Sequence, residues 1–281
     1  MKYNRPRSLA QYFEQAGAVP AAGVTVLAGG TDLMPGYENG RPLPVHLLDI
    51  KALPELRGIV ERDHEIEIGA LTTIEQIRAN SAINTLFTAL VEAADQFAGP
   101  QIRHRATIGG NLVNASPAGD TLPPLYAYGA VVKITGPAGE RTVPLEEFIT
   151  GPGQTTLAPG ELVQSVILPK LRHRSLFYKL GLRQAMAIAV VNFAITYAVK
   201  NGAFSHLAIA AGAVAPKVVL LDTLTEALVS RGATIDDAMH LVDNDISPID
   251  DLRAPADYRR TVLKNVLAYT LRNLLGGGNG R

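Results

Sequence analysis

A glycine pair flanked by polar side chains occurs at two distant places in this 281-residue chain. The first, Gly29-Gly30, ends the short β-branched run Val24–Ala28, and the second, Gly109-Gly110, lies between Thr107 and Asn111. Glycine lets a backbone approach a ligand closely and adopt a positive φ. Successive backbone N–H groups in such segments form concave sites for phosphate oxygens. The two pairs together favour two loops that hold a pyrophosphate from both sides.

Each glycine pair alone is also typical of a tight turn after a strand. Neither pair has the spacing G-x-G-x-x-G, so a nicotinamide-type dinucleotide fold lacks its fingerprint. The motifs G-x-x-x-x-G-K-[ST], H-E-x-x-H and G-x-S-x-G are also absent from the sequence. The residues alone therefore leave both the turn and the phosphate-binding interpretation open.

Strand and helix patterns alternate as far as about residue 170. The predicted elements after the first strand are the strands Leu47–Ile50, Ile66–Ala70, Val131–Ile134 and Leu162–Leu168 and the helices Ile74–Ala79 and 82–98. Gly99-Pro100 is expected to end the second helix. Segments 35–44 and 148–159 are predicted to be loops, and the basic run Pro169–Arg174 is predicted to join two domains.

Beyond this junction the pattern changes. Met186–Lys200 fits a long strand or a buried helix, but the hairpin signal Asn201-Gly202 favours two antiparallel strands. Three helices are predicted next, at Leu221–Ser230, Ile235–Val242 and Tyr258–Leu275. The glycine-rich tail Gly276–Arg281 is expected to fray.

Composition excludes several classes of protein. Lys plus Arg and Asp plus Glu each count 26, so bulk charge gives no reason to expect a nucleic-acid partner. The cysteine count is zero, which excludes disulfides, thiolate metal sites and a cysteine nucleophile. The six histidines show no metal-ligand spacing, so no metal is assigned. A polar N-terminus predicts no signal peptide, and the apolar stretch Ala185–Val199 is too short to span a membrane at ~20 residues. A cytoplasmic protein is expected.

Both glycine segments strongly resemble the FAD pyrophosphate loops of one protein family. LAGGTDL (27–33) and TIGGNLVNASPAGDT (107–121) are similar to those loops in the FAD-binding (medium) subunit of the molybdenum hydroxylase family, of xanthine dehydrogenase and carbon monoxide dehydrogenase type. The stretches IEIGALTTIEQI, FAGPQIRHRATIGGN, YKLGLRQAMAIAVVNFAI and APADYRRTVLKNVL also resemble the family, so the likeness covers nearly the whole chain.

The resemblance implies an α+β fold. It predicts a two-subdomain FAD-binding domain of the PCMH type at 1–171, with subdomains at about 1–57 and 58–171. A C-terminal domain of the molybdenum-hydroxylase flavoprotein type, made of a small antiparallel sheet with helices, is expected at 172–281.

The resemblance also implies the residues that bind FAD. Those of the first loop are Leu27, Ala28, Gly29, Gly30, Thr31, Asp32 and Leu33, and those of the second are Thr107, Gly110, Asn111 and Val113. Asp120 matches a carboxylate near the adenosine end, where it would accept hydrogen bonds from ribose hydroxyls. Phe97 and Ala98 match positions that line the flavin cleft, Leu162 matches an adenine contact, and Lys179 matches a lysine near the flavin. No catalytic residue is assigned.

These positions have plainer interpretations from the residues alone. Asp120 precedes Thr121 and is a candidate helix N-cap. Phe97 and Leu162 suit an apolar core, and Lys179 suits a solvated surface. The basic run Arg103–Arg105 before the second loop either offsets phosphate charge or forms a solvated turn, and the turn is favoured.

The family implies an oxidoreductase component that transfers electrons. A large subunit would carry the molybdenum cofactor, a small subunit would carry [2Fe-2S] clusters, and this chain would bind FAD non-covalently. The assembly is expected to be a hetero-oligomer, possibly a dimer of heterotrimers, and the acceptor (NAD, quinone, ferredoxin or oxygen) is open. Since this chain has no cysteine, the clusters must lie on a partner. Alternatives are an independent FAD-dependent oxidoreductase with its own substrate pocket and a flavin-free scaffold. One departure is Ala187, where many relatives carry Asp.

Overall fold

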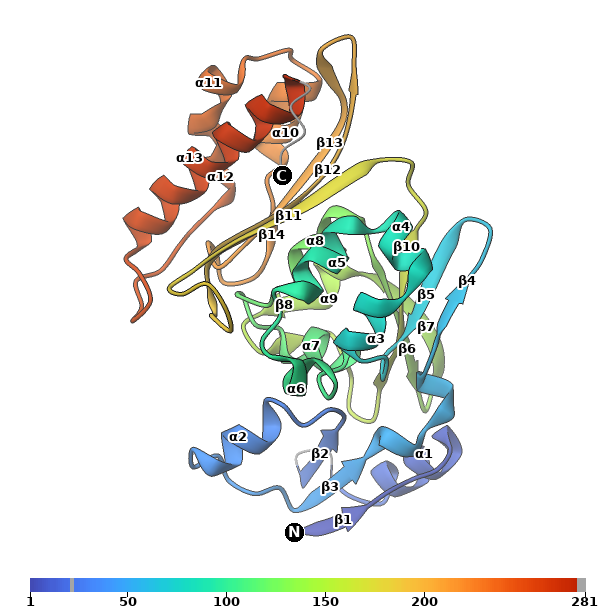
Figure 1. The fold of residues 1–281 in the computed structure, drawn as a ribbon. Coiled ribbons are helices and arrows are strands. Elements are labelled where there is room, and N and C mark those ends of the chain that lie inside the picture. The colour runs from blue at the N-terminus through green and yellow to red at the C-terminus, as the bar shows by residue number, and fades with distance from the viewer. Residues whose placement is uncertain (21–22, 277–281) are drawn as a thin grey trace. The chain divides into compact units, whose positions relative to one another are not determined.

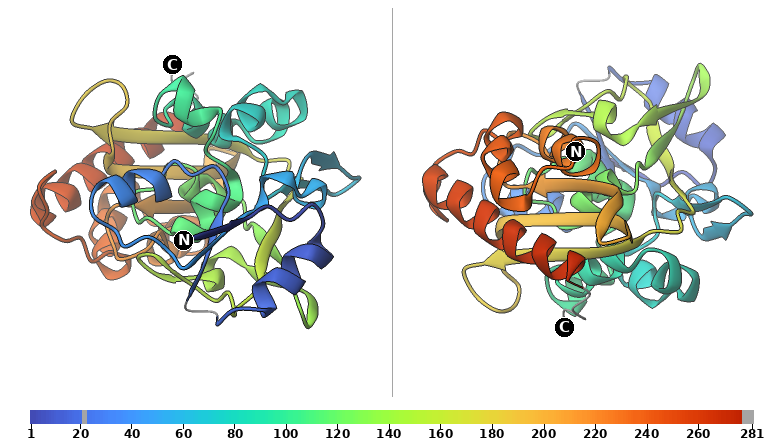
Figure 2. Two further views of the ribbon diagram at one scale, coloured as in Figure 1. Left: turned by 90° about the horizontal axis from the view of Figure 1, so that it is seen from below. Right: turned by 90° about the horizontal axis from the view of Figure 1, so that it is seen from above.

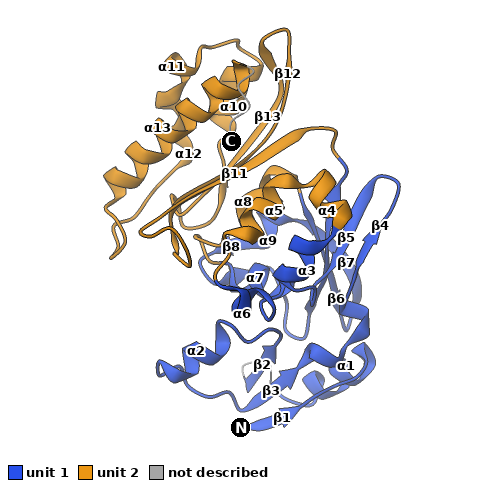
Figure 3. Cartoon of the chain, in the orientation of Figure 1, with its two compact units in different colours: residues 1–80, 99–115, 130–170 blue, residues 81–98, 116–129, 171–281 orange. Residues whose placement is uncertain are grey.

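The computed structural model describes residues 1–20 and 23–276 and divides the chain into two compact units (Figure 3). Unit 1 comprises residues 1–80, 99–115 and 130–170, and unit 2 comprises residues 81–98, 116–129 and 171–281. Each unit is therefore built from segments that are far apart in the sequence. The expected domains at 1–171 and 172–281, and the division of the first near residue 57, stay predictions.

Three sheets form the strand framework in the described part of unit 1 (Figure 1). A parallel sheet has the order β1-β3-β2, and an antiparallel sheet has the order β4-β5-β10-β6-β7. β8 and β9 form a small hairpin. The bounds are β1 Lys2–Asn4, β2 Val24–Leu27, β3 His46–Asp49, β4 Ile59–Glu61, β5 Glu65–Gly69, β6 Val131–Gly136, β7 Gly139–Pro144, β8 Ile149–Gly151, β9 Gln154–Thr155 and β10 Leu162–Pro169.

Short helices connect and cover these sheets. They are α1 Leu9–Gly17, α2 Leu33–Glu38, α3 Ile74–Ala79, α6 Pro100–Arg103, α7 Ile108–Asn114 and α9 Leu145–Phe148, with the 3-10 turns η2 Ile50–Ala52 and η3 Pro54–Leu56. α3 has the predicted bounds because Thr73 and Gln76 form a reciprocal capping box at its start. An apolar cluster that includes Tyr12, Leu48, Leu71 and Leu162 stabilises this unit.

Unit 2 is built on a four-stranded antiparallel sheet ordered β11-β12-β13-β14. The strands are β11 Arg174–Gly181, β12 Ala189–Lys200, β13 Ala203–Gly212 and β14 Val219–Leu220. Asn201 and Gly202 join β12 to β13 with φ values of 54° and 77°. Positive φ at both turn residues is the two-residue hairpin geometry that Asn-Gly favours. The predicted pair of antiparallel strands is thereby confirmed, and the helical alternative is wrong.

Helices cover this sheet, and α13 lies against β12 (Figure 2). The helices are α4 Ser81–Leu86, α5 Thr88–Asp95, α8 Leu122–Ala127, α10 Asp222–Val229, α11 Ile235–Ala238, α12 Val242–Asp245 and α13 Ala256–Leu275, with the 3-10 turn η4 Met239–Leu241. Phe193 and Ile195 of β12 pack in one buried cluster with Leu263 and Leu267 of α13. Among the described residues, no helix is both long and apolar enough to cross a membrane.

Several predicted elements differ from the structure. The segment predicted as a loop at 35–44 begins inside α2, and the loop predicted at 148–159 contains β8 and β9. The helix predicted over 82–98 is two helices, separated at Phe87. Gly99-Pro100 does not end a helix but begins α6, because proline suits a first helical turn. Of the tail expected to fray, residues 277–281 lie outside the described part of the chain.

Candidate functional site

The first glycine segment follows the carboxyl end of β2 in unit 1. Gly30 has φ of 77°, which a residue with a side chain rarely adopts. The chain then enters α2, whose first turn is fixed by the Met34 N–H donating to the Gly30 carbonyl at 3.0 Å. Asp32 precedes this helix, is exposed, and pairs with Arg41 at 3.6 Å. The segment is therefore a turn between a strand and a helix.

The second glycine segment is helical rather than a loop. Thr107 is the N-cap of α7, and its Oγ1 accepts a hydrogen bond from the Gly110 N–H at 3.1 Å. Gly109 lies in the first turn, where a methyl group would sit 2.6 Å from the Ala70 Cβ. The expectation of a loop is wrong here because Thr107 supplies the cap that a helix start requires.

Both glycine segments meet within unit 1. A methyl group on Gly29 would lie 2.1 Å from the carbonyl oxygen of Arg105, two residues before Thr107. A methyl group on Gly110 would lie 2.9 Å from the Thr107 Oγ1 and 4.0 Å from the Ala28 Cβ. Glycine at position 29 is thus required by close backbone packing between the two segments. The structure brings the two predicted pyrophosphate loops side by side.

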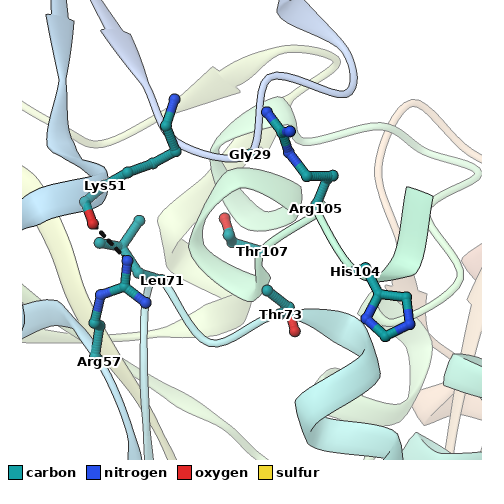
Figure 4. Close-up of a pocket in the computed structure, with 8 residues that line it drawn as sticks. All are labelled: Gly29, Lys51, Arg57, Leu71, Thr73, His104, Arg105 and Thr107. Carbon is teal, nitrogen blue, oxygen red and sulfur yellow. Dashed lines mark hydrogen bonds between the residues drawn. The ribbon is translucent and has the colours of Figure 1, made fainter. Parts of the chain in front are cut away.

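A pocket of about 180 Å³ opens where these segments meet. Its lining consists of Gly29, Lys51, Arg57, Leu71, Thr73, His104, Arg105 and Thr107, all from unit 1. We call it the basic pocket. Lys51 and Arg57 lie on one side, and Arg105 lies beside Gly29 on the other (Figure 4). The pocket contains one predicted residue from each glycine segment together with cationic side chains.

The other predicted residues of unit 1 have varied surroundings. Leu27 is buried, Asn111 is half-buried and Val113 is exposed. Leu162 is buried in the cluster that also contains Tyr12 and Leu71. This position agrees with the plainer interpretation of Leu162 as a core residue, and its predicted contact with adenine stays a prediction.

Unit 2 contains the remaining predicted residues, and two of them form a buried ion pair. The Lys179 Nζ lies 2.6 Å from the Asp120 Oδ2, and the two side chains are only 5% and 10% exposed. The Asn192 Nδ2 donates to the Asp120 Oδ1 at 3.3 Å. Burial raises the pKa of Asp120, while Lys179 and Asn192 oppose that rise. The alternative of a solvated Lys179 is wrong, because its side chain is buried in this pair. The alternative of an N-capping Asp120 is also wrong, because Thr121 is the residue before α8.

Phe97 and Ala98 follow α5 and are both half-buried. Ala98 adopts a left-handed φ of 39°. The Lys179 ammonium donates to the carbonyl of Gln96 at 3.1 Å, immediately before this pair. Lys179 therefore links the Phe97–Ala98 segment to Asp120 within unit 2, and four predicted residues of this unit form one connected group.

The basic run Arg103–Arg105 divides into two roles. Arg103 is used structurally, since its Nε lies 3.2 Å from the Glu75 Oε2 and its side chain is 15% exposed. His104 and Arg105 are exposed and line the basic pocket.

Three site residues were not predicted from the sequence, namely Lys51, Arg57 and Asn192. No motif marks the first two, because they come from short turns after β3 whose position depends on tertiary packing.

Comparison with known proteins identifies the family. Residues 1–171 match the FAD binding domain in molybdopterin dehydrogenase, and residues 176–274 match the CO dehydrogenase flavoprotein C-terminal domain. The chain belongs to the family of FAD-binding subunits of molybdopterin dehydrogenases, as its two glycine segments suggested. It is an oxidoreductase component whose cofactor is FAD, and the α+β fold class is confirmed.

Relatives cover almost the whole chain. The xanthine dehydrogenase FAD-binding subunit of Escherichia coli O157:H7 is 30% identical and aligns over 99% of this chain and 97% of its own length. The carbon monoxide dehydrogenase medium chain of Hydrogenophaga pseudoflava is also 30% identical, over 96% of this chain and 95% of its own. A solved structure of carbon monoxide dehydrogenase from Hydrogenophaga pseudoflava that lacks the Mo-pyranopterin moiety matches with a TM-score of 0.91 at 29% identity, over 97% and 96% of the two chains.

Proposed function

We propose that this chain is the flavin subunit of a multi-subunit molybdenum hydroxylase. It would pass electrons from [2Fe-2S] clusters on a small partner subunit through FAD to an external acceptor. A large partner subunit would hold the molybdenum cofactor and hydroxylate the substrate, and the complex, possibly a dimer of heterotrimers, would work in the cytoplasm. Relatives named as medium chains and FAD-binding subunits support this assignment. The absence of cysteine supports it too, because thiolates must hold such clusters on another chain.

The observation that carries the proposal is the contact between the two glycine segments in unit 1. Gly29 has no side chain and packs directly against the Arg105 backbone, so the two segments bring their main chains together at one place. This meeting point suits the diphosphate of FAD, since glycine backbone lets a ligand approach closely. We assign to it the whole first segment, Leu27–Leu33, and Thr107, Gly110, Asn111 and Val113 of the second. The isoalloxazine ring supplies the redox chemistry, while the protein binds and orients it.

We assign the residues of unit 2 to the same cofactor. Asp120 would accept hydrogen bonds from ribose hydroxyls, and its carboxylate has unused lone pairs beyond those taken by Lys179 and Asn192. Phe97 and Ala98 would line the flavin cleft, with Lys179 near the flavin and Leu162 of unit 1 against adenine. The chain's own residues bind, orient and exclude water, and none is assigned a proton-transfer role.

The site assignment is tested by Gly29→Ala in the full chain. The added methyl group must push the Arg105 backbone away, so we expect FAD affinity to fall at least about tenfold, a loss of ~1.4 kcal/mol. Gly17→Ala is the matched control, because a methyl group on Gly17 meets no atom within 4 Å. Equilibrium titration of FAD measures both. Equal FAD affinity in Gly29→Ala and the natural chain would refute the assignment of the first segment.

Purification of the tagged chain from its native host tests the proposed partners. We expect FAD, iron and molybdenum to co-purify with it, along with a large and a small subunit. FAD without either metal would contradict the proposal and would instead fit the independent FAD-dependent oxidoreductase.

A further inference from the structure

We propose that the cationic side chains of the basic pocket bind the diphosphate that joins the flavin and adenosine halves of FAD. These side chains would make the chain prefer ligands that carry a diphosphate. This inference rests on the proposed function, and it adds Lys51, Arg57 and Arg105 to the residues that hold the cofactor. The backbone of the glycine segments carries no full charge. A diphosphate is a dianion, so cationic side chains at the same place add Coulomb attraction to its binding.

The pocket lies at the right place for this role. Gly29 and Thr107, one from each glycine segment, form part of its wall. Arg105 is tied directly to this geometry, since its carbonyl oxygen is the atom that packs against Gly29. Figure 4 shows the Arg105 side chain beside Gly29. Any anion bound between the segments lies within reach of this side chain.

Charge in the pocket is unbalanced. Its lining contains Lys51, Arg57 and Arg105 but no aspartate or glutamate. Lys51 pairs with the buried Asp49 at 3.1 Å. Within the described residues of unit 1, Arg57 and Arg105 have no carboxylate at salt-bridge distance, and the Arg57 guanidinium donates only to the Lys51 carbonyl. The whole chain has zero net charge, so this local excess does not reflect a generally basic protein.

Size and polarity favour part of a dinucleotide. About 180 Å³ is less than the ~300–1,000 Å³ typical of pockets that enclose a whole ligand. Leu71 forms an apolar wall and belongs to the same buried cluster as Leu162, which is assigned to adenine. A pocket with cations on two sides and this apolar wall fits a diphosphate joined to an adenosine.

Competition with FAD in the full, FAD-free chain tests the inference. In the natural chain, ADP should displace FAD much better than adenosine does, because only ADP carries the diphosphate. Arg57→Gln and Arg105→Gln should each weaken FAD and ADP about 3- to 5-fold, the upper range for an exposed charge pair, and the double variant about tenfold. Adenosine binding should not change. High salt should weaken FAD binding less in the double variant than in the natural chain.

Arg7→Gln is the matched control, since Arg7 is an exposed arginine of unit 1 outside the pocket lining. Thermal unfolding without ligand should be the same for all variants, because both pocket arginines are exposed. If the natural chain binds FAD but the double variant keeps its FAD and ADP affinities, the inference is wrong while the proposed function stands. If ADP competes no better than adenosine, the inference fails together with the assignment of the glycine segments to the diphosphate. If the natural chain does not bind FAD, the proposed function fails first.

Discussion

At the scale of single residues, one buried carboxylate in unit 2 explains why three other positions carry the residues they do. Asp120 needs a cation, which Lys179 supplies, and a second donor, which Asn192 supplies from β12. Asn192 faces Gly212 on β13, where a methyl group would lie 2.2 Å from the Asn192 Oδ1. Burying a charge is costly unless it is paired and hydrogen-bonded. Glycine at position 212 therefore makes room for an amide that the carboxylate requires.

Breaking the Asp120–Lys179 pair from one side should be costly. Lys179→Met leaves a buried carboxylate without its cation, so we expect the free energy of unfolding of the FAD-free chain to fall by about 3 kcal/mol. The double variant Asp120→Asn/Lys179→Met should recover a large part of that loss. Urea unfolding of the natural chain, Asp120→Asn, Lys179→Met and the double variant gives the coupling energy of the pair. Additive losses in the double variant would show that the pair has no energetic coupling.

Gly212→Ala should destabilise unit 2 by ~1–3 kcal/mol, the usual cost of overpacking. The methyl group collides with Asn192, so the same substitution in an Asn192→Ala background should cost much less. Thermal unfolding of both pairs of proteins measures the difference. A cost of Gly212→Ala that does not depend on Asn192 would refute this explanation of the glycine.

At the scale of elements, an ion-pair network fixes α6 against α3 just before the second glycine segment. Glu75 of α3 accepts from Arg78 at 2.7 Å and from Arg103 of α6 at 3.2 Å. Arg78 above all, and then Arg103, lower the pKa of Glu75 from 4.5 to about 2. Arg103 is four residues before Thr107, so this network ties α6 to α3 close to the start of α7.

The lowered pKa of Glu75 predicts a dependence of stability on pH. A carboxylate with a lowered pKa in the folded state contributes fully above its unfolded value of 4.5, and the contribution is lost as the pH falls toward about 2. Between about pH 6 and about pH 3, the natural chain should lose ~1 kcal/mol more stability than Glu75→Gln. Glu38→Gln, an exposed change in the same unit, serves as the control. Parallel stability curves for the natural chain and Glu75→Gln would contradict the role of the network.

Elements were predictable from the sequence where the local signal agrees with tertiary packing. The capping box of α3 and the Asn201-Gly202 turn are such cases. α2 was missed because Pro35 reads as a helix breaker, although a proline in the first turn removes no helical hydrogen bond. The break at Phe87 has no local signal, because the ring is held edge-on to Tyr128 at 5.0 Å, far along the chain.

The residues of the candidate site also differ in whether the sequence could predict them. Both glycine segments were recognisable because close backbone approach restricts the choice of residue to glycine. Lys51 and Arg57 were not, because a lysine or arginine in a short turn usually faces solvent. Only the packing of those turns against the glycine segments brings the two side chains to one pocket with Arg105.

At the scale of the whole molecule, a chain without cysteine belongs to a family of redox proteins. We assign it one task, which is to hold FAD, and propose that iron and molybdenum lie on partner chains. On this proposal, damage to the glycine segments should remove one cofactor and leave the others. Gly110→Val is suited to this, because its added methyl groups would enter the space between Thr107 and Ala28.

The most direct measurement is the FAD, iron and molybdenum content of the complex purified from the native host with the natural chain and with Gly110→Val. We predict that the variant complex loses most of its FAD while iron and molybdenum per complex stay unchanged. Full FAD content in an otherwise intact Gly110→Val complex, or a natural complex that contains FAD but no iron and no molybdenum, would contradict the account.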